Sequence, residues 1–196
     1  MNYIEYEREK QSDNKRIMSM YFDKEHINYA RSADFFITND NKLKNRASLI
    51  YSKIYIRTIV CNLRQFLYCV AIKKATGIFP DINHGMREPE LRALSKQIIP
   101  PVLKDYYLVL GKHPINSKNN IIFSPDKLIT IDVYLCFMSA EDEVCYWGIK
   151  EEDFKQPDPI VWQLNTDCQR KLLTVTSTTQ IFTLFIYNYL NSLNGK

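Results

Sequence analysis

Four short runs rich in β-branched and aromatic residues constrain the fold of this chain most, and all of them lie in its second half. They span residues 131–138, 143–149, 160–164 and 172–176. Each has the length of a strand and is bounded by polar, turn-forming residues. A further apolar run at 121–123 follows a turn. The pattern predicts an antiparallel sheet of about four to six strands.

Helical patterns occupy the first half of the chain. Apolar residues recur at three- and four-residue steps over 46–76, which predicts one long helix that ends at Gly77. Two shorter helices are expected over 89–96, where Pro89 suits a first turn, and over 102–110. The first half should therefore be helical.

The C-terminus is expected to close the fold with a helix. Ser177 and Gln180 have the spacing of a capping box and precede a periodic apolar stretch. Helices, then antiparallel strands, then a helix indicate an α+β fold. We expect a single domain over 1–196, with a helical extension at 1–45 and the core at 46–196.

The two central strand runs predict a hairpin around the polar turn 139–142. If the hairpin is symmetric, Cys136 lies opposite Cys145 and Tyr134 lies opposite Trp147. Both faces of such a hairpin are apolar, so we expect it in the middle of a sheet with cover on each side. A reducing compartment argues against a Cys136–Cys145 disulfide.

The sequence contains no motif of a known catalytic or metal-binding centre. Walker, GxGxxG and GxSxG motifs are absent, and the five cysteines and three histidines lack metal-ligand spacing. We therefore expect no enzyme activity, no cofactor and no metal. The N-terminus does not resemble a signal peptide, and no apolar run is long enough to span a bilayer, so we expect a cytoplasmic protein without membrane contact. The five cysteines are Cys61, Cys69, Cys136, Cys145 and Cys168.

The net charge of +4 conceals a strong asymmetry. Residues 51–120 carry eleven basic and four acidic groups, whereas 121–196 carry six and ten. Seven of those acidic residues fall within 141–158. A charge cluster of this kind is either a solvated loop or an electrostatic face for a basic partner.

The basic region raises nucleic-acid binding as another function. Its tyrosines and basic side chains would lie on the helix predicted over 46–76, with Lys53, Arg57, Arg64 and Lys73 on one side. A pI near 8.7 falls short of strongly basic nucleic-acid-binding domains, and a solvated helix face explains the same residues.

Two stretches resemble the SUKH superfamily, the fold of the yeast cell-wall assembly regulator and of many bacterial immunity proteins. The first is PELRALSKQIIPPVLKDYYLVLG, where Ile99-Pro100 resembles the family's Leu-Pro before a helix that ends at Gly111. The second is EVCYWGIKEEDFKQPDPIVWQ, with an aromatic strand, an acidic loop and the pair Asp158-Pro159. The likeness covers about half of the chain.

The resemblance implies a non-catalytic protein that binds and neutralises a cognate toxin, such as a nuclease. An acidic surface would complement a nuclease active site, which is basic because it binds polyphosphate. A regulatory scaffold that binds an endogenous protein is the alternative. For the tryptophans, packing in the core is the competing interpretation. The expected partner-binding residues are Glu141, Asp142, Glu143, Trp147, Glu151, Glu152, Asp153, Asp158 and Trp162.

Overall fold

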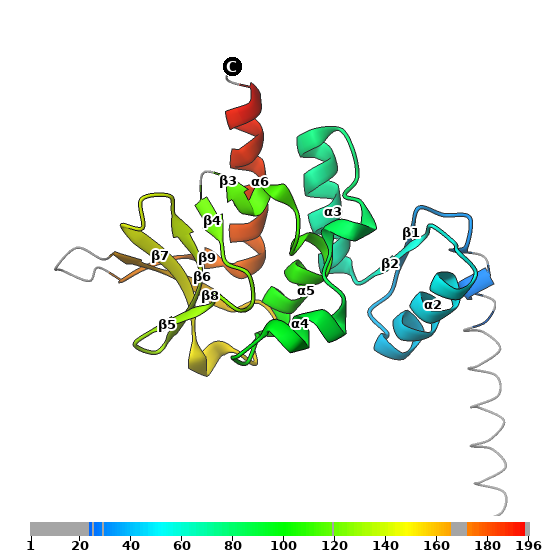
Figure 1. The fold of residues 1–196 in the computed structure, drawn as a ribbon, viewed down its shortest axis with the longest axis horizontal. Helices are drawn as coiled ribbons and strands as arrows, with labels where there is room; N and C mark the ends of the chain where they lie inside the picture. Colours follow the sequence, from blue (N-terminus) through cyan, green and yellow to red (C-terminus); the bar gives the residue numbers. More distant parts are fainter. Residues whose placement is uncertain (1–23, 25, 29, 119, 166–171, 195–196) are drawn as a thin grey trace, which may run out of the picture. The chain divides into compact units, whose positions relative to one another are not determined.

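The chain forms two compact units, residues 1–63 and 64–196, which we describe separately. The computed structural model describes residues 24, 26–28, 30–118, 120–165 and 172–194 (Figure 1). The expectation of one domain over 1–196 stays a prediction. Of the helical extension expected over 1–45, residues 1–23, 25 and 29 lie outside the described residues.

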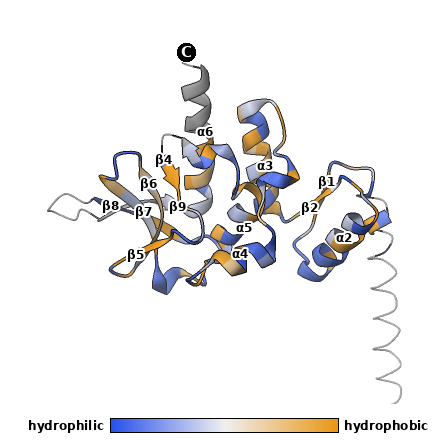
Figure 2. Ribbon diagram, viewed as in Figure 1, coloured by the Kyte–Doolittle hydropathy of each residue, from blue (hydrophilic) through white to orange (hydrophobic). Residues whose placement is uncertain are grey.

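In the first unit, the described residues after 34 form a small two-stranded parallel sheet and the helix between its strands, and residues 26–28 are also helical. Strand β1 (Phe35–Ile37) pairs with β2 (Ile59–Cys61), and α2 (Asn41–Lys53) connects them. Asp40 begins α2 because its carboxylate accepts hydrogen bonds from the amides of Lys42 and Leu43. Orange and blue stretches alternate along α2 in Figure 2, as expected for a helix with one buried side. The apolar cluster of the first unit comprises Ile27, Leu43, Ala47 and Tyr51.

The prediction of a single long helix over 46–76 is wrong. The chain leaves α2 at Ile54, passes through Tyr55 with a left-handed backbone (φ 55°), and enters β2 before a second helix, α3 (Leu63–Thr76), begins. Neighbouring β-branched residues at 58–60 favour a strand, and pairing with β1 outweighs the helical periodicity. The predicted end at Gly77 is confirmed, since φ there is 77°.

The second unit continues with two helices that the sequence predicts well. Helix α4 (Glu88–Leu94) has a proline in its first turn, and α5 (Pro101–Leu110) ends at Gly111. Two short 3-10 helices, η1 (Ile82–His84) and η2 (Pro114–Asn116), flank them. Gly85 follows η1 where the chain passes so close to α5 that a Cβ would lie 2.1 Å from the Leu108 carbonyl oxygen.

A seven-stranded antiparallel sheet forms the rest of the second unit, followed by a helix. The strands lie in the order β3-β4-β6-β7-β8-β9, and β5 also pairs with β6. This confirms the α+β class with helices first, an antiparallel sheet with six strands along its main path, and a closing helix. The bounds are β3 (Ser117–Lys118), β4 (Asn120–Ile122), β5 (Ile129–Ile131), β6 (Tyr134–Ala140), β7 (Cys145–Lys150), β8 (Ile160–Asn165), β9 (Leu172–Ser177) and α6 (Thr178–Asn194).

The hairpin of β6 and β7 exists, but its predicted register is wrong. Cys136 lies opposite Gly148 rather than Cys145, and Tyr134 lies opposite Lys150 rather than Trp147. Strand β6 runs on to Ala140, so the turn falls at 141–144, and a bulge interrupts the pairing between 136 and 138.

The main core lies between helices and one face of the sheet. Helices α5 and α6 pack on the same side of the strands (Figure 1). The ring of Phe182 on α6 stacks on Tyr106 of α5 with centroids 4.0 Å apart and also contacts Phe137 of β6. Among the described residues, no helix is both long and apolar enough to cross a membrane.

Candidate functional site

The first acidic group lies in the turn that joins β6 to β7. Glu141, Asp142 and Glu143 are all exposed there. Glu143 has a left-handed backbone, with φ 56°, and its amide donates to the Ala140 carbonyl at 3.0 Å. The turn therefore closes tightly and presents three carboxylates to solvent.

The second acidic group lies at the other end of β7, in the 3-10 helix η3 (Glu151–Asp153). Glu151 and Glu152 are exposed, and Asp153 is half-buried. The Lys150 ammonium lies 2.6 Å from a Glu152 carboxylate oxygen, and this hydrogen bond raises the pKa of Lys150. One carboxylate of this group is therefore paired with a neighbouring lysine.

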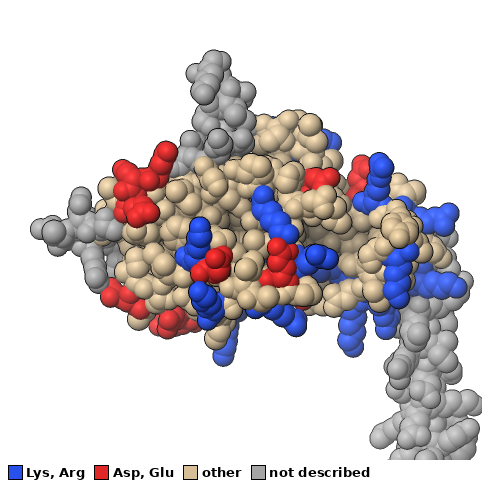
Figure 3. Space-filling model, viewed as in Figure 1, with Lys and Arg blue, Asp and Glu red and all other residues tan. Residues whose placement is uncertain are grey.

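Strand β7 separates the two acidic groups. A strand rises about 3.3 Å per residue, so its six residues place them about 20 Å apart. Figure 3 likewise shows red side chains gathered in separate groups instead of one patch. The carboxylates that form one segment in the sequence thus form two distinct surfaces.

The carboxylate of Asp158 makes hydrogen bonds within the chain. Its carboxylate accepts hydrogen bonds from the amide of Thr179 at 2.8 Å and from the Thr179 hydroxyl at 2.9 Å. Both contacts lie at the first turn of α6, where a carboxylate satisfies backbone donors and complements the helix dipole. The carboxylate predicted to meet a partner is therefore already engaged within the chain.

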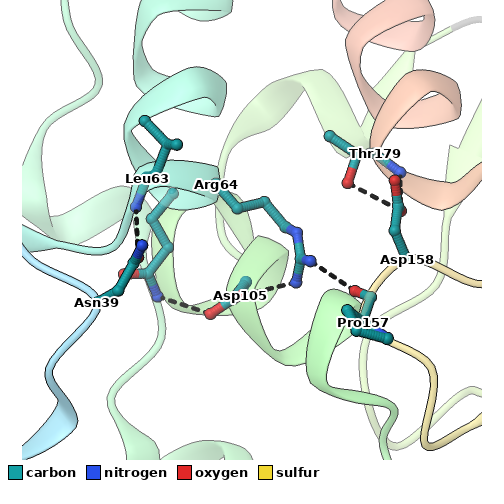
Figure 4. Close-up of polar contacts among 8 residues, drawn as sticks. Asn39, Leu63, Arg64, Asp105, Pro157, Asp158 and Thr179 are labelled. Carbon is teal, nitrogen blue, oxygen red and sulfur yellow. Dashed lines mark hydrogen bonds and ion pairs between the residues drawn. The ribbon is translucent and has the colours of Figure 1, made fainter.

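Arg64 at the start of α3 anchors the same loop from another direction. Its guanidinium lies 3.0 Å from the Asp105 carboxylate of α5, which also accepts a hydrogen bond from Gln65 at 3.2 Å. The guanidinium donates as well to the carbonyl of Pro157 (Figure 4). The segment after η3 is thereby fixed to α3 and α6, and Asp105 of α5 holds the Arg64 side chain.

The two tryptophans lie on opposite faces of the sheet. Trp147 pairs with Met138 and packs against the main core, as the competing interpretation expects. Trp162 of β8 pairs with Gly148 and joins a separate cluster on the other face, where its ring centroid lies 5.9 Å from that of Tyr134. The two indole side chains therefore cannot contact a partner together as one apolar anchor.

Two residues of this second cluster, Tyr134 and Tyr146, are not among the partner-binding residues predicted from the sequence. Their alternation along the strands is visible in the sequence. Assigning both tyrosines to the face of Trp162, however, requires the true register, in which Tyr146 pairs with Leu164 of β8. A symmetric hairpin places Tyr146 on the wrong face.

The basic residues proposed for nucleic acid do not share one helix. Lys53 ends α2 and Arg57 follows it, whereas Arg64 and Lys73 lie on α3. Arg64 is engaged as described above. The ammonium of Lys73 lies 4.2 Å from the centre of the Phe79 ring, a cation–π contact.

The four described cysteines are buried free thiols, and Cys168 lies outside the described residues. Burial raises the pKa of Cys61 to about 11 and that of Cys136 to about 12, so both are protonated and weakly nucleophilic at neutral pH. His113 contacts the ring of His84, with centroids 4.5 Å apart. Where side chains are described, no three His, Cys, Asp or Glu residues gather as metal ligands.

We therefore take the sheet around β7 as the candidate site, because carboxylates lie at both of its ends and aromatic rings lie on one of its faces. Comparison with known proteins adds no assignment: no family model, curated protein or solved structure matches the chain.

Proposed function

We propose that this chain is a cytoplasmic immunity protein of the SUKH type, which binds a cognate toxin such as a nuclease and neutralises it without catalysis. One observation carries the proposal. Between Asp132 and Asp158 the chain has eight acidic and two basic residues. Five of those carboxylates are exposed in the two turns at the ends of β7.

Clustered, exposed carboxylates contribute mainly to the recognition of a partner. They accelerate encounter with a basic partner and repel polyanions such as nucleic acid. A toxin that binds polyphosphate presents the opposite charge and is therefore a matching partner. The anchoring of the loop by Arg64 and Asp158 adds preorganisation, which lowers the entropy lost on binding.

The experiment is survival of cells that express the toxin encoded beside this gene, with and without this chain. We expect rescue by the wild type and loss of rescue when Glu151, Glu152 and Asp153 are all changed to lysine. Asp34→Lys is the control, because Asp34 is an exposed acidic residue of the first unit. Absence of rescue by the wild type contradicts the proposal.

A further inference from the structure

The face of the sheet turned away from α5 and α6 carries its own apolar cluster, which we call the outer face. Every member of this cluster comes from β5, β6, β7 or β8. Among the described residues, no helix contributes a side chain to it. The cluster comprises Tyr134, Cys136 and Leu164, with Ile131, Tyr146 and Trp162 packed against them.

The outer face remains accessible at its centre and margins. Tyr146 and Trp162 are half-buried, and Ile160, on the same side of β8 as Trp162, is 43% exposed. Ile129 pairs with Cys136 and is 38% exposed. Large aromatic and aliphatic side chains that stay accessible on one surface are typical of the centre of a protein interface.

Gly148 lies in the middle of this face, between Cys136 and Trp162, and adds no side chain to it. A Cβ at this position would lie 3.2 Å from the Cys136 sulfur and 3.2 Å from the Tyr134 Cβ. Because Gly148 has no side chain, it leaves room on this face beside the indole of Trp162, its partner across the strands.

Among the residues that the structure describes, two buried polar atoms on this face have no hydrogen-bond partner. They are the indole nitrogen of Trp162 and the hydroxyl of Ser139, which pairs with Tyr146 across the strands. A buried polar atom without a hydrogen-bond partner lowers stability.

Each end of the outer face lies beside one acidic turn. Burial raises the pKa of Tyr146, and the nearby Glu143 carboxylate raises it further. At the other end, Lys150 lies opposite Tyr134 and bonds to Glu152. Carboxylates of both acidic turns thus reach the margin of a single aromatic surface.

We propose that the outer face, centred on Trp162, binds a basic segment of a protein partner that places an apolar side chain on the indole and directs Lys or Arg side chains to the acidic turns. Charge complementarity identifies this occupant, because the margins carry carboxylates at both ends. An interface with an apolar centre and a charged rim has the usual anatomy of specific recognition. The inference rests on the proposed function, since it names the surface by which the toxin would be bound.

The test is selection of random linear peptides, displayed on phage, against the immobilised full-length protein. We expect enrichment of peptides that combine Lys or Arg with an aromatic or aliphatic residue. Their affinity should fall at least about tenfold in Trp162→Ala, because a central aromatic residue carries a large share of interface energy. Salt should weaken binding, because about 1 M salt shortens the Debye length to about 3 Å.

Ile160→Lys is the second variant, because it changes an exposed side chain and adds a charge that repels a basic segment. Ile98→Lys is its matched control: Ile98 is 78% exposed and lies between α4 and α5. Thermal unfolding of every variant confirms that it folds. Enrichment of neutral or acidic peptides, no enrichment, or equal affinity for wild type and Ile160→Lys would overturn the inference.

The two proposals fail in different ways. If the toxin is not neutralised but basic peptides lose affinity in Ile160→Lys, the proposed function is wrong and the surface stands. If the toxin is neutralised equally well by wild type and Ile160→Lys, the function stands and the outer face is not its binding surface.

Discussion

The guanidinium of Arg64 lies 3.0 Å from the carboxylate of Asp105, and the two side chains are only 22% and 15% exposed. Removing one partner of a shielded pair leaves the other charge without compensation. Arg64→Ala should therefore lower the free energy of unfolding by about 1 to 3 kcal/mol, measured by urea denaturation. Arg92→Ala is the control, because its pair with Glu88 is exposed; a change there as large as at Arg64 would contradict the argument.

Asp158→Ala should destabilise the fold because it removes two hydrogen bonds to Thr179 at the start of α6. Loss of a helix cap costs about 1 kcal/mol. Thermal or urea unfolding measures the change, and Asp158→Asn, which keeps one acceptor oxygen, should recover part of it. Equal stability of Asp158→Ala and wild type would exclude the capping role.

Stability should decrease in mild acid because of His113. Burial, together with the neighbouring His84 ring, lowers the pKa of His113 to about 4, whereas an unfolded histidine titrates near pH ~6.5. Between these values the unfolded chain binds a proton that the folded protein does not. The free energy of unfolding therefore falls as the pH falls from about 6.5 to about 4.

His113→Asn isolates this effect. The Nδ1 atom of His113 accepts a hydrogen bond from the Ile115 amide, and an asparagine oxygen can replace that acceptor without titrating. Urea unfolding across this pH range should show a shallower dependence in His113→Asn than in wild type or in His26→Asn, whose exposed histidine serves as control. Parallel curves for His113→Asn and wild type would contradict the assignment.

Two glycines should respond differently to alanine. At Gly85 a Cβ would meet the Leu108 carbonyl oxygen at 2.1 Å, and the backbone of α5 cannot easily move, so Gly85→Ala should cost about 3 kcal/mol. At Gly77 nothing lies within 4 Å, and only the left-handed backbone opposes a side chain. Gly77→Ala should cost about 1 kcal/mol, and a larger loss there than at Gly85 would show that the close approach is not limiting.

Local patterns in the sequence predict most elements of the second unit. Pro89, the proline pair at 100–101 and the glycine at 111 mark where α4 and α5 begin or end, because proline and glycine act through the local backbone. The alternating runs likewise predict β6, β7 and β8. These signals need no knowledge of distant residues.

Features that depend on tertiary contacts could not be predicted in this way. The break between α2 and α3 exists because β2 pairs with β1, a partner more than 20 residues away in the chain. The register of β6 and β7 depends on a bulge near Phe137, which shifts the faces of Tyr146 and Trp147. The candidate site follows from that register, so the carboxylates were predictable and the outer face was not.

The strand between the two acidic turns determines how their contributions combine. Groups about 20 Å apart share no hydrogen-bond network and are screened by salt at a Debye length of about 8 Å. Changes in binding free energy from Asp142→Asn and from Glu151→Gln should therefore add in the double variant. A ligand too small to span β7 would respond to one substitution and ignore the other, so whether one or both single substitutions weaken binding reports the size of whatever binds.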